Sequence, residues 1–428
     1  MCGIAGIVDL RGSREINRAA LKRMTGALAH RGPDGEGFFV EDGVGLGHRR
    51  LAVIDLGGGA QPMKSASGGG VLTYNGEIYN FRELASALTQ RGALLRTDSD
   101  SEVLVEGLHR EGTPFIDGLR GMFAFAYWNR ATRTLTLARD RFGEKPLYYC
   151  ETPEGFLLFA SEIGALRAAQ MMTFDHAPDA VAEYFLYGYV PEPKSIYRQV
   201  RRLEAGCTLT AGPGRRIAIH RYWRPQFNPD LSMSFKEAQA ELLDLLDDAV
   251  EAQRVSDVPL GAFLSGGVDS AAIVSSMAHK GDEIRTFTIG FDDPKFDERD
   301  AARRTAFRLA VDDARRVKRG IRFEGEKAPF ADRFEAQAPR DAAAPRQVDV
   351  EVLEDAAQHE GAHGRFVPAR RDVAALAADK RDAHDRTGLA DLDVSKTRAR
   401  RRACARREAG GARRRENKEE HGDRAQGL

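Results

Sequence analysis

The chain has 428 residues, of which 42% are hydrophobic and 30% are charged, and its formal net charge is +0. This composition is typical of soluble globular proteins, and the length predicts roughly two or three domains. A neutral chain without an apolar run of about 18 residues indicates neither a nucleic-acid partner nor a membrane partner.

The cysteines and the N-terminus indicate the cellular compartment. Cys2, Cys150, Cys207 and Cys404 are widely scattered and form no CxxC pair, so neither a metal site nor a disulfide framework is predicted. The N-terminus lacks the basic and apolar segments of a signal peptide. We therefore expect a cytoplasmic protein, because thiols stay reduced in the cytoplasm.

Cys2 follows the initiator methionine directly. If Met1 is removed, Cys2 carries both a thiol and a free α-amino group, whose unperturbed pKa is about 8. The thiolate is the nucleophilic form of cysteine, and an N-terminal amine can activate it. The alternative is a small apolar residue near a frayed terminus. The apolar run 4–8 predicts a strand that would hold Cys2 rigidly.

The first two hundred residues alternate between strand and helix patterns, which predicts a layered α+β domain over residues 2–222. An Asn-Gly pair at Asn75-Gly76 predicts that the strand before it ends in a tight turn. The predicted strands cover 4–8, 45–55, 71–74, 121–128, 134–138 and 155–160, the predicted helices cover 17–28, 81–90 and the segment after Glu102, and a hairpin is predicted at 206–222.

Five motifs occur in order along this segment. They are Cys2-Gly3-Ile4-Ala5-Gly6, Arg31-Gly32-Pro33-Asp34-Gly35, His48-Arg49-Arg50-Leu51, Tyr74-Asn75-Gly76-Glu77-Ile78-Tyr79-Asn80 and Arg139-Asp140-Arg141-Phe142-Gly143. Together they resemble the glutaminase domain of class II glutamine amidotransferases. The resemblance implies an N-terminal nucleophile hydrolase fold, an αββα sandwich.

The resemblance also implies roles for individual residues. Cys2 attacks the glutamine amide, and the Asn75 side chain and the Gly76 N–H form the oxyanion hole. Arg50 pairs with the α-carboxylate, a task suited to its forked guanidinium, while Glu77 and Asp100 take the α-ammonium. The full predicted glutamine-binding set is Arg50, Leu51, Ala52, Val53, Ile54, Asn75, Gly76, Glu77 and Asp100. The alternatives are a plain turn at Asn75-Gly76, a surface cation at Arg50 and a helix cap at Asp100.

A predicted linker at 223–234 separates the first domain from a second folded region. We call this region the second organisation and expect it to extend over 235–306. Residues 235–252 have the spacing of an amphipathic helix. An apolar strand at 258–264 then leads into Ser265-Gly266-Gly267-Val268-Asp269-Ser270 and a helix at 271–278. Strand, glycine-rich turn and helix form the geometry that binds phosphate. The Walker sequence is absent from the chain.

The loop resembles the SGGxDS signature of ATP pyrophosphatases and implies a partial α/β domain of the adenine nucleotide alpha hydrolase type. The implied ATP-binding residues are Leu264, Ser265, Gly266, Gly267, Asp269, Ser270 and Ile289, of which Asp269 would also hold Mg²⁺. A glutaminase domain before such a loop resembles the asparagine synthetase family. The implied substrates are glutamine, aspartate and ATP, and a homodimer stays open.

The implied reaction transfers ammonia from glutamine to an adenylated aspartate carboxylate, giving asparagine, AMP and pyrophosphate. Three alternatives stay open. The segment Tyr187–Pro193 is similar to a relative associated with exopolysaccharide and exosortase loci, whose acceptor is another carboxylate. The chain can also be a glutaminase alone or a non-catalytic remnant.

The resemblance stops near residue 307. The family's second loop, SGDGxDE, has no counterpart in 303–428, and the composition turns to Arg, Ala, Asp and Glu without sustained periodicity. We expect 307–428 to be disordered, and to arise from a GC-rich coding region read out of frame. A native basic tail is the alternative.

Overall fold

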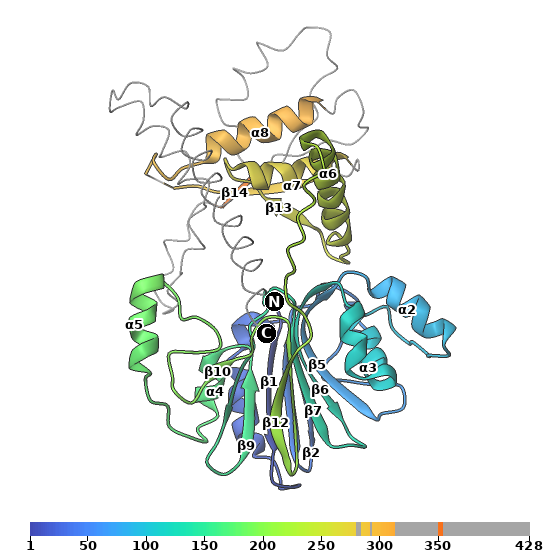
Figure 1. The fold of residues 1–428 in the computed structure, drawn as a ribbon, viewed down its shortest axis with the longest axis vertical. Coiled ribbons are helices and arrows are strands. Elements are labelled where there is room, and N and C mark those ends of the chain that lie inside the picture. The colour runs from blue at the N-terminus through green and yellow to red at the C-terminus, as the bar shows by residue number, and fades with distance from the viewer. Residues whose placement is uncertain (280–283, 292, 313–349, 354–428) are drawn as a thin grey trace, which may run out of the picture. The chain divides into compact units, whose positions relative to one another are not determined.

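The computed structural model describes residues 1–279, 284–291, 293–312 and 350–353 (Figure 1). The first domain contains two six-stranded antiparallel sheets, with strand orders β10-β8-β9-β1-β3-β2 and β12-β11-β7-β6-β5-β4. The first sheet comprises β1 (Gly3–Asp9), β2 (Gly35–Glu41), β3 (Val44–Arg50), β8 (Tyr148–Glu151), β9 (Phe156–Ala160) and β10 (Arg201–Arg202). The second comprises β4 (Met63–Lys64), β5 (Gly70–Ile78), β6 (Gly121–Asn129), β7 (Thr134–Arg139), β11 (Cys207–Gly212) and β12 (Arg215–Arg221).

The two sheets pack face to face and are covered on both outer sides by helices. One apolar cluster, which includes Ile4, Leu46, Trp128 and Leu137, lies between the sheets. The other clusters join the first sheet to α1 (Arg18–Gly26) and α4 (Ile163–Ala168), and the second sheet to α2 (Phe81–Gln90) and α3 (Asp100–Glu111). The predicted αββα sandwich is therefore confirmed.

Side-chain alternation along β1 explains this burial on both sides. Ile4 and Val8 belong to the cluster between the sheets, whereas Ala5 and Ile7 belong to the cluster beneath α1 and α4. Successive side chains of a strand point to opposite faces. An almost continuous apolar run therefore suits a strand that has a packed layer on each side.

Two predicted strand ends are wrong. The Asn75-Gly76 pair is not a turn, because β5 continues to Ile78 and Asn75 pairs with Ala124 in the neighbouring β6. A long antiparallel partner overrides the local turn preference of the Asn-Gly pair. The strand predicted over 45–55 ends at Arg50, because the following segment folds back and offers its carbonyls to the Arg50 guanidinium.

The second organisation begins with α6 (Phe235–Ala252), whose Ser234 and Glu237 form a capping box. The parallel strands β13 (Gly261–Phe263) and β14 (Arg285–Ile289) flank α7 (Val268–His279), which confirms the predicted strand–loop–helix order. A small core joins these elements to α8 (Arg299–Asp312).

One described helix crosses the boundary predicted at residue 307, and one described strand lies beyond it. The helix α8 continues through it to Asp312, and β15 (Val350–Leu353) pairs in parallel with β14. The rest of the tail predicted over 307–428 lies outside the described residues.

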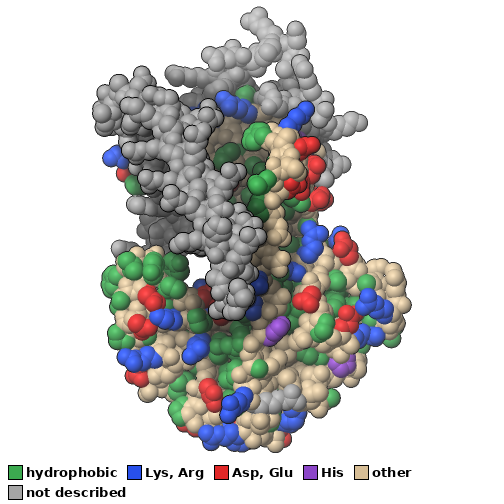
Figure 2. All heavy atoms as spheres, in the orientation of Figure 1, with side chains coloured by type: hydrophobic (Ala, Val, Ile, Leu, Met, Phe, Trp, Pro, Cys, Tyr) green, Lys and Arg blue, Asp and Glu red, His purple; other side chains and the backbone are tan. Residues whose placement is uncertain are grey.

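Charged side chains of both signs are interspersed on the face drawn in Figure 2. Hydrophobic side chains gather over α5 (Pro178–Tyr187), where Phe185 is 82% exposed and Leu186 is 72% exposed. Among the described residues, no helix has the length and apolar character needed to cross a membrane.

Candidate active site

Cys2 lies directly before β1, and its surroundings hold it from both sides. The Leu51 N–H donates to Cys2 Sγ at 3.4 Å, and Arg31 Nε donates to the Cys2 carbonyl at 2.9 Å. Arg31 is in turn paired with Glu162 at 2.8 Å. The thiol therefore has a defined position even though it stands beside the chain terminus.

Sγ opens into a cavity of about 90 Å³ that collects most of the predicted glutamine-binding residues. Of the predicted set, the cavity is lined by Cys2, Arg50, Leu51, Val53, Ile54, Asn75, Gly76, Glu77 and Asp100. Ala52 is the predicted residue that does not line it. The Ala52 N–H instead donates to Asp34 Oδ2 at 2.9 Å and fastens the loop.

Asn75 carries an unpartnered donor in this cavity. The residue is 1% exposed, and within the described part of the chain its Nδ2 has no hydrogen-bond partner. A buried polar group left without a partner is unfavourable and is uncommon in folded proteins. Its place beside Cys2 gives the cavity a preorganised N–H donor.

Gly76 is required by the close approach of β6 as well as by any ligand. A Cβ atom at this position would collide with the Met122 carbonyl and the Phe123 Cα of the paired strand. A glycine is therefore needed at this position for the pairing of β5 with β6.

The cavity is lined by charged groups of both signs. The Arg50 guanidinium donates to the carbonyls of Leu56 at 2.9 Å and Asp55 at 2.6 Å. Glu77 and Asp100 supply carboxylates to the same cavity. Burial raises the pKa of both carboxyls, and the Asp100 charge raises the pKa of Glu77 further. This arrangement can bind a zwitterion such as a free amino acid.

Asp100 is positioned by hydrogen bonds and is not the helix cap. Its Oδ2 accepts from the Tyr74 hydroxyl at 2.9 Å and from the Ile78 N–H at 3.1 Å. The cap of α3 is Ser99, whose side chain accepts from the Ser101 N–H. The alternative that Asp100 merely caps the helix is thereby wrong.

The acid–base properties of the terminus follow from its burial. Burial raises the pKa of the Cys2 thiol, while the hydrogen bond with Leu51 and the positive terminal amine oppose the shift. Burial also lowers the pKa of the Met1 amino group, Cys2 opposes this shift, and the Arg31 and Lys145 cations add to it. Both shifts favour the neutral forms, the thiol of Cys2 and the unprotonated amine of Met1.

Several lining residues were missed in the sequence. They are Met1, Gly59, Gln61, Tyr74, Ser99, Ser101, Met122 and Lys145. Tyr74 lies in a motif identified above, and Lys145 follows shortly after another. Gln61 has no local signal, because only folding brings its loop to β5, where Gln61 Oε1 accepts from the Tyr74 N–H at 2.6 Å.

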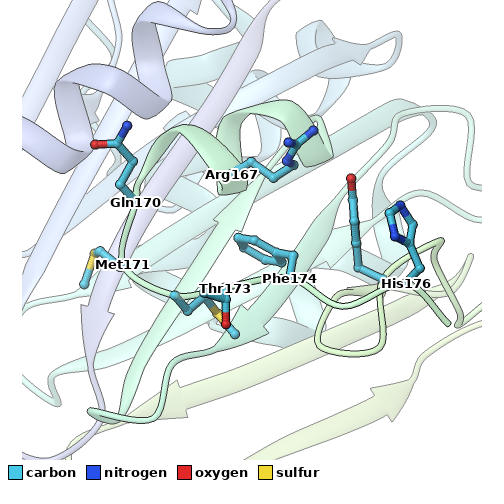
Figure 3. A pocket seen from close by; sticks show the side chains of 8 residues that line it. Arg167, Gln170, Met171, Thr173, Phe174 and His176 are labelled. Atoms are coloured by element: carbon cyan, nitrogen blue, oxygen red, sulfur yellow. The ribbon is translucent and has the colours of Figure 1, made fainter.

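A larger hollow of about 690 Å³ contains none of the predicted site residues. Its lining comes from the end of α4, the segment after it and Tyr197, and Figure 3 shows the Arg167, Phe174 and His176 side chains around it. The Arg167 guanidinium lies 5.7 Å from the centroid of the Tyr197 ring. This hollow is therefore separate from the cavity at Cys2.

The glycine-rich loop of the second organisation is closed by its own serines. The hydroxyls of Ser265 and Ser270 are 2.9 Å apart, and the Gly267 N–H donates to Ser265 Oγ at 3.1 Å. The Gly266 N–H donates to a Glu298 carboxylate oxygen at 3.2 Å. A carboxylate thus occupies a place where this loop can bind an anion.

The remaining predicted ATP residues lie around the loop. Leu264 is 2% exposed and donates its N–H to the Phe287 carbonyl in β14, whereas Ile289 is 47% exposed. Asp269 is exposed in the first turn of α7. No cluster of three metal-binding side chains occurs among the residues that the structure describes. One carboxylate suits Mg²⁺ only where phosphate oxygens complete the coordination.

Comparison with known proteins gives a family match for the first domain and another for the region after the linker. The model of a glutamine amidotransferase domain matches residues 1–223, and the model of asparagine synthase matches residues 241–321. Glutamine-hydrolysing asparagine synthetase 1 of Bacillus subtilis is 36% identical over 319 residues, which cover 74% of this chain and 50% of that protein. Asparagine synthetase B of Escherichia coli is 33% identical over 282 residues, which cover 65% and 45%.

Solved structures give more distant matches. The glutamine phosphoribosylpyrophosphate amidotransferase of B. subtilis, complexed with ADP and GMP, has a TM-score of 0.40 at 16% identity and covers 67% of this chain and 75% of that chain. A glutamine aminotransferase class-II domain protein from Silicibacter pomeroyi has a TM-score of 0.26 at 14% identity, covering 52% and 99%. The chain spans about half the length of the curated relatives that it matches.

Proposed function

Because the chain belongs to the asparagine synthetase family, with its glutamine amidotransferase domain, we propose that Cys2 hydrolyses the side-chain amide of glutamine. The observation that carries this proposal is the buried, unpartnered Asn75 Nδ2 in the same cavity as Cys2 Sγ. A hydrogen-bond donor held in place before the reaction is what a developing oxyanion requires.

The reaction begins after removal of Met1. The Cys2 α-amine takes the thiol proton, and the thiolate attacks the amide carbon to form a tetrahedral oxyanion. Asn75 Nδ2 and the Gly76 N–H stabilise that oxyanion. Its collapse breaks the C–N bond, the ammonium returns the proton to the leaving nitrogen, and ammonia departs. Water then hydrolyses the thioester, which releases glutamate and restores the thiol.

The charged residues orient the substrate. Arg50 pairs with the α-carboxylate of glutamine, and Glu77 with Asp100 binds its α-ammonium. Leu51, Val53 and Ile54 line the remaining wall. The presence of the Arg50 cation and of two carboxylates in the same cavity as Cys2 supports this orientation.

For the second organisation, we propose that Ser265–Ser270 bind the pyrophosphate part of ATP, with Leu264 and Ile289 beside the adenosine. The Glu298 carboxylate on the Gly266 N–H supports an affinity of this loop for anions. Asp269 would hold Mg²⁺, which neutralises phosphate charge when bound. The acceptor that we propose is the side-chain carboxylate of aspartate.

Glutamate release from glutamine tests the glutaminase assignment. We expect Cys2→Ala to abolish release, because no nucleophile remains, and Asn75→Ala to lower kcat about 10²–10³-fold through loss of one oxyanion donor. Intact mass of the same sample should show that Met1 has been removed.

Cys404→Ala is the matched control, since it removes a thiol from a part of the sequence outside the glutaminase domain. It should hydrolyse glutamine like the wild type. Wild-type rates in Cys2→Ala would contradict the proposal.

A further inference from the structure

Lys145 is a nearly buried cation in the glutaminase cavity that the mechanism above does not use. Its side chain lines the cavity with Cys2, Asn75 and Glu77, and the residue is 5% exposed. Burying an ammonium is costly unless a partner compensates for the lost hydration. A lysine in this place therefore requires an explanation.

The main chain of Lys145 is held firmly. Its N–H donates to Asp140 Oδ2 at 3.0 Å, and its carbonyl accepts from Arg139 Nε at 2.7 Å. Arg139 is 1% exposed and is itself paired with Glu192 at 2.6 Å. These contacts fix the point from which the lysine side chain enters the cavity.

The partner of the ammonium is unusual. Within the described part of the chain, the Lys145 ammonium donates to a thioether, because Nζ lies 3.0 Å from Met1 Sδ. Sulfur is a weak acceptor, and removal of Met1 takes it away. The Lys145 ammonium thus lies within hydrogen-bond distance of the residue that directly precedes Cys2.

Further charged groups act on the terminal amine, on Cys2 and on Lys145. The titratable and charged residues that act on the terminus, on Cys2 or on Lys145 are Arg31, Asp34, Arg50, Glu77, Asp100, Asp140 and Glu144. Burial lowers the pKa of Lys145, and the carboxylates of Glu77 and Glu144 oppose that shift. Lys145 and Arg31 are the cations that act on the terminal amine.

We propose that Lys145 is a positioning residue of the glutaminase site, which presents a fixed positive charge to the α-amine of Cys2 once Met1 is removed. This inference rests on the proposed function of that amine as a base. A neighbouring cation disfavours the protonated amine, so a larger fraction of the amine is unprotonated and available as a base at neutral pH. Lys145 acts through the amine and does not touch the reacting amide.

The pH profile of glutamine hydrolysis tests this inference. We expect Lys145→Met to move the acid limb of kcat/KM to higher pH by about one unit, because the amine gains proton affinity. At pH values below the amine pKa of both proteins, kcat/KM of Lys145→Met is then about tenfold lower than that of the wild type. At alkaline pH the two values become equal. Lys145→Arg should restore the wild-type limb, because arginine keeps its charge at every accessible pH.

Lys22→Met is the matched control, since Lys22 is exposed on α1, and its profile should equal the wild type. Lys145→Gln serves as a second neutral variant, and thermal unfolding confirms that each variant is folded. An unmoved acid limb in a folded neutral variant overturns the inference. So does a raised KM for glutamine at all pH values without a shift, which would assign Lys145 to substrate binding.

A second measurement needs no glutamine. The carbon chemical shifts of Cys2 in ¹³C-cysteine-labelled protein, assigned with Cys2→Ser, report the titration of its amine directly. A higher amine pKa in Lys145→Met supports the inference even if the wild type does not hydrolyse glutamine, in which case the proposed function alone fails. Active wild type with an unchanged amine pKa in the variant overturns the inference alone.

Discussion

Asn75 and His48 are both buried residues with an unpartnered nitrogen, yet their surroundings differ. Asn75 Nδ2 belongs to the cavity at Cys2, where a substrate can supply the missing acceptor. His48 is 1% exposed, and its Nδ1 lies 3.2 Å from Thr73 Oγ1. Burial, with the nearby Arg50 cation, lowers the pKa of His48 to about 3. His48 is therefore a neutral residue of the interior.

This low pKa predicts a pH-dependent stability. Between pH 6.5 and 5 the unfolded chain protonates His48 while the folded chain does not, so the free energy of unfolding falls by about 1.4 kcal/mol per pH unit. The contribution is fully present above pH 6.5. Urea unfolding at pH 7, 6 and 5 measures the slope, and His48→Gln should have a smaller one. Equal slopes in both proteins would contradict the assignment.

At the scale of elements, the β5–β6 pair determines how the cavity at Cys2 is built. Asn75, Gly76 and Glu77 stand in one continuous strand, opposite residues 122–124 of β6. Their alternation along the strand and the close approach at Gly76 result from that pairing. A free loop would hold these groups less firmly than a strand that pairs with its neighbour along its whole length.

Gly76→Ala should therefore damage both stability and activity. The new methyl group meets the Met122 carbonyl, and the backbone must shift at a cost of about 1–3 kcal/mol. Thermal unfolding and glutamate release measure the two effects. Gly26→Ala is the control, because a Cβ at Gly26 meets no atom within 4 Å. Equal melting temperatures for the two variants would contradict the role of the strand contact.

At the scale of the whole chain, the two described bodies differ in completeness. The first has three large apolar clusters, whereas the second has one small cluster. Helix α6 contributes no buried residue, and Leu242, Leu243 and Leu245 are 66%, 53% and 59% exposed. The loop SGDGxDE expected from the family has no counterpart in the sequence after residue 303.

We accordingly expect glutamine hydrolysis without asparagine formation. Incubation with glutamine, aspartate, ATP and Mg²⁺ should release glutamate and ammonia, because the cavity at Cys2 lies within the complete first domain. Asparagine and pyrophosphate, measured by mass spectrometry and a phosphate assay, should stay at background. Asparagine production at the rate of glutamine hydrolysis would contradict this expectation and support a complete synthetase.

Strong local sequence patterns were sufficient to predict many of the helices and strands. The predicted helices over 81–90 and 235–252 coincide with α2 and α6, and β11 with β12 forms the hairpin predicted at 206–222. Prediction failed where pairing with a neighbouring strand determines the backbone conformation. The turn at Asn75-Gly76 was predicted from two residues, but the continuous pairing of β5 with β6 replaces it.

The sequence by itself determined the order of the motifs, the prediction of a nucleophile at Cys2 and the strand–loop–helix around Ser265–Ser270, because each depends on neighbouring residues. Only the tertiary structure decided that Asn75 keeps an unpartnered donor in the cavity at Cys2 and that Lys145 enters it as a buried cation. These residues are far apart along the chain. They meet because strand pairing and the loop contacts of Arg139 and Asp140 bring them together, and such long-range contacts leave no local periodic signal.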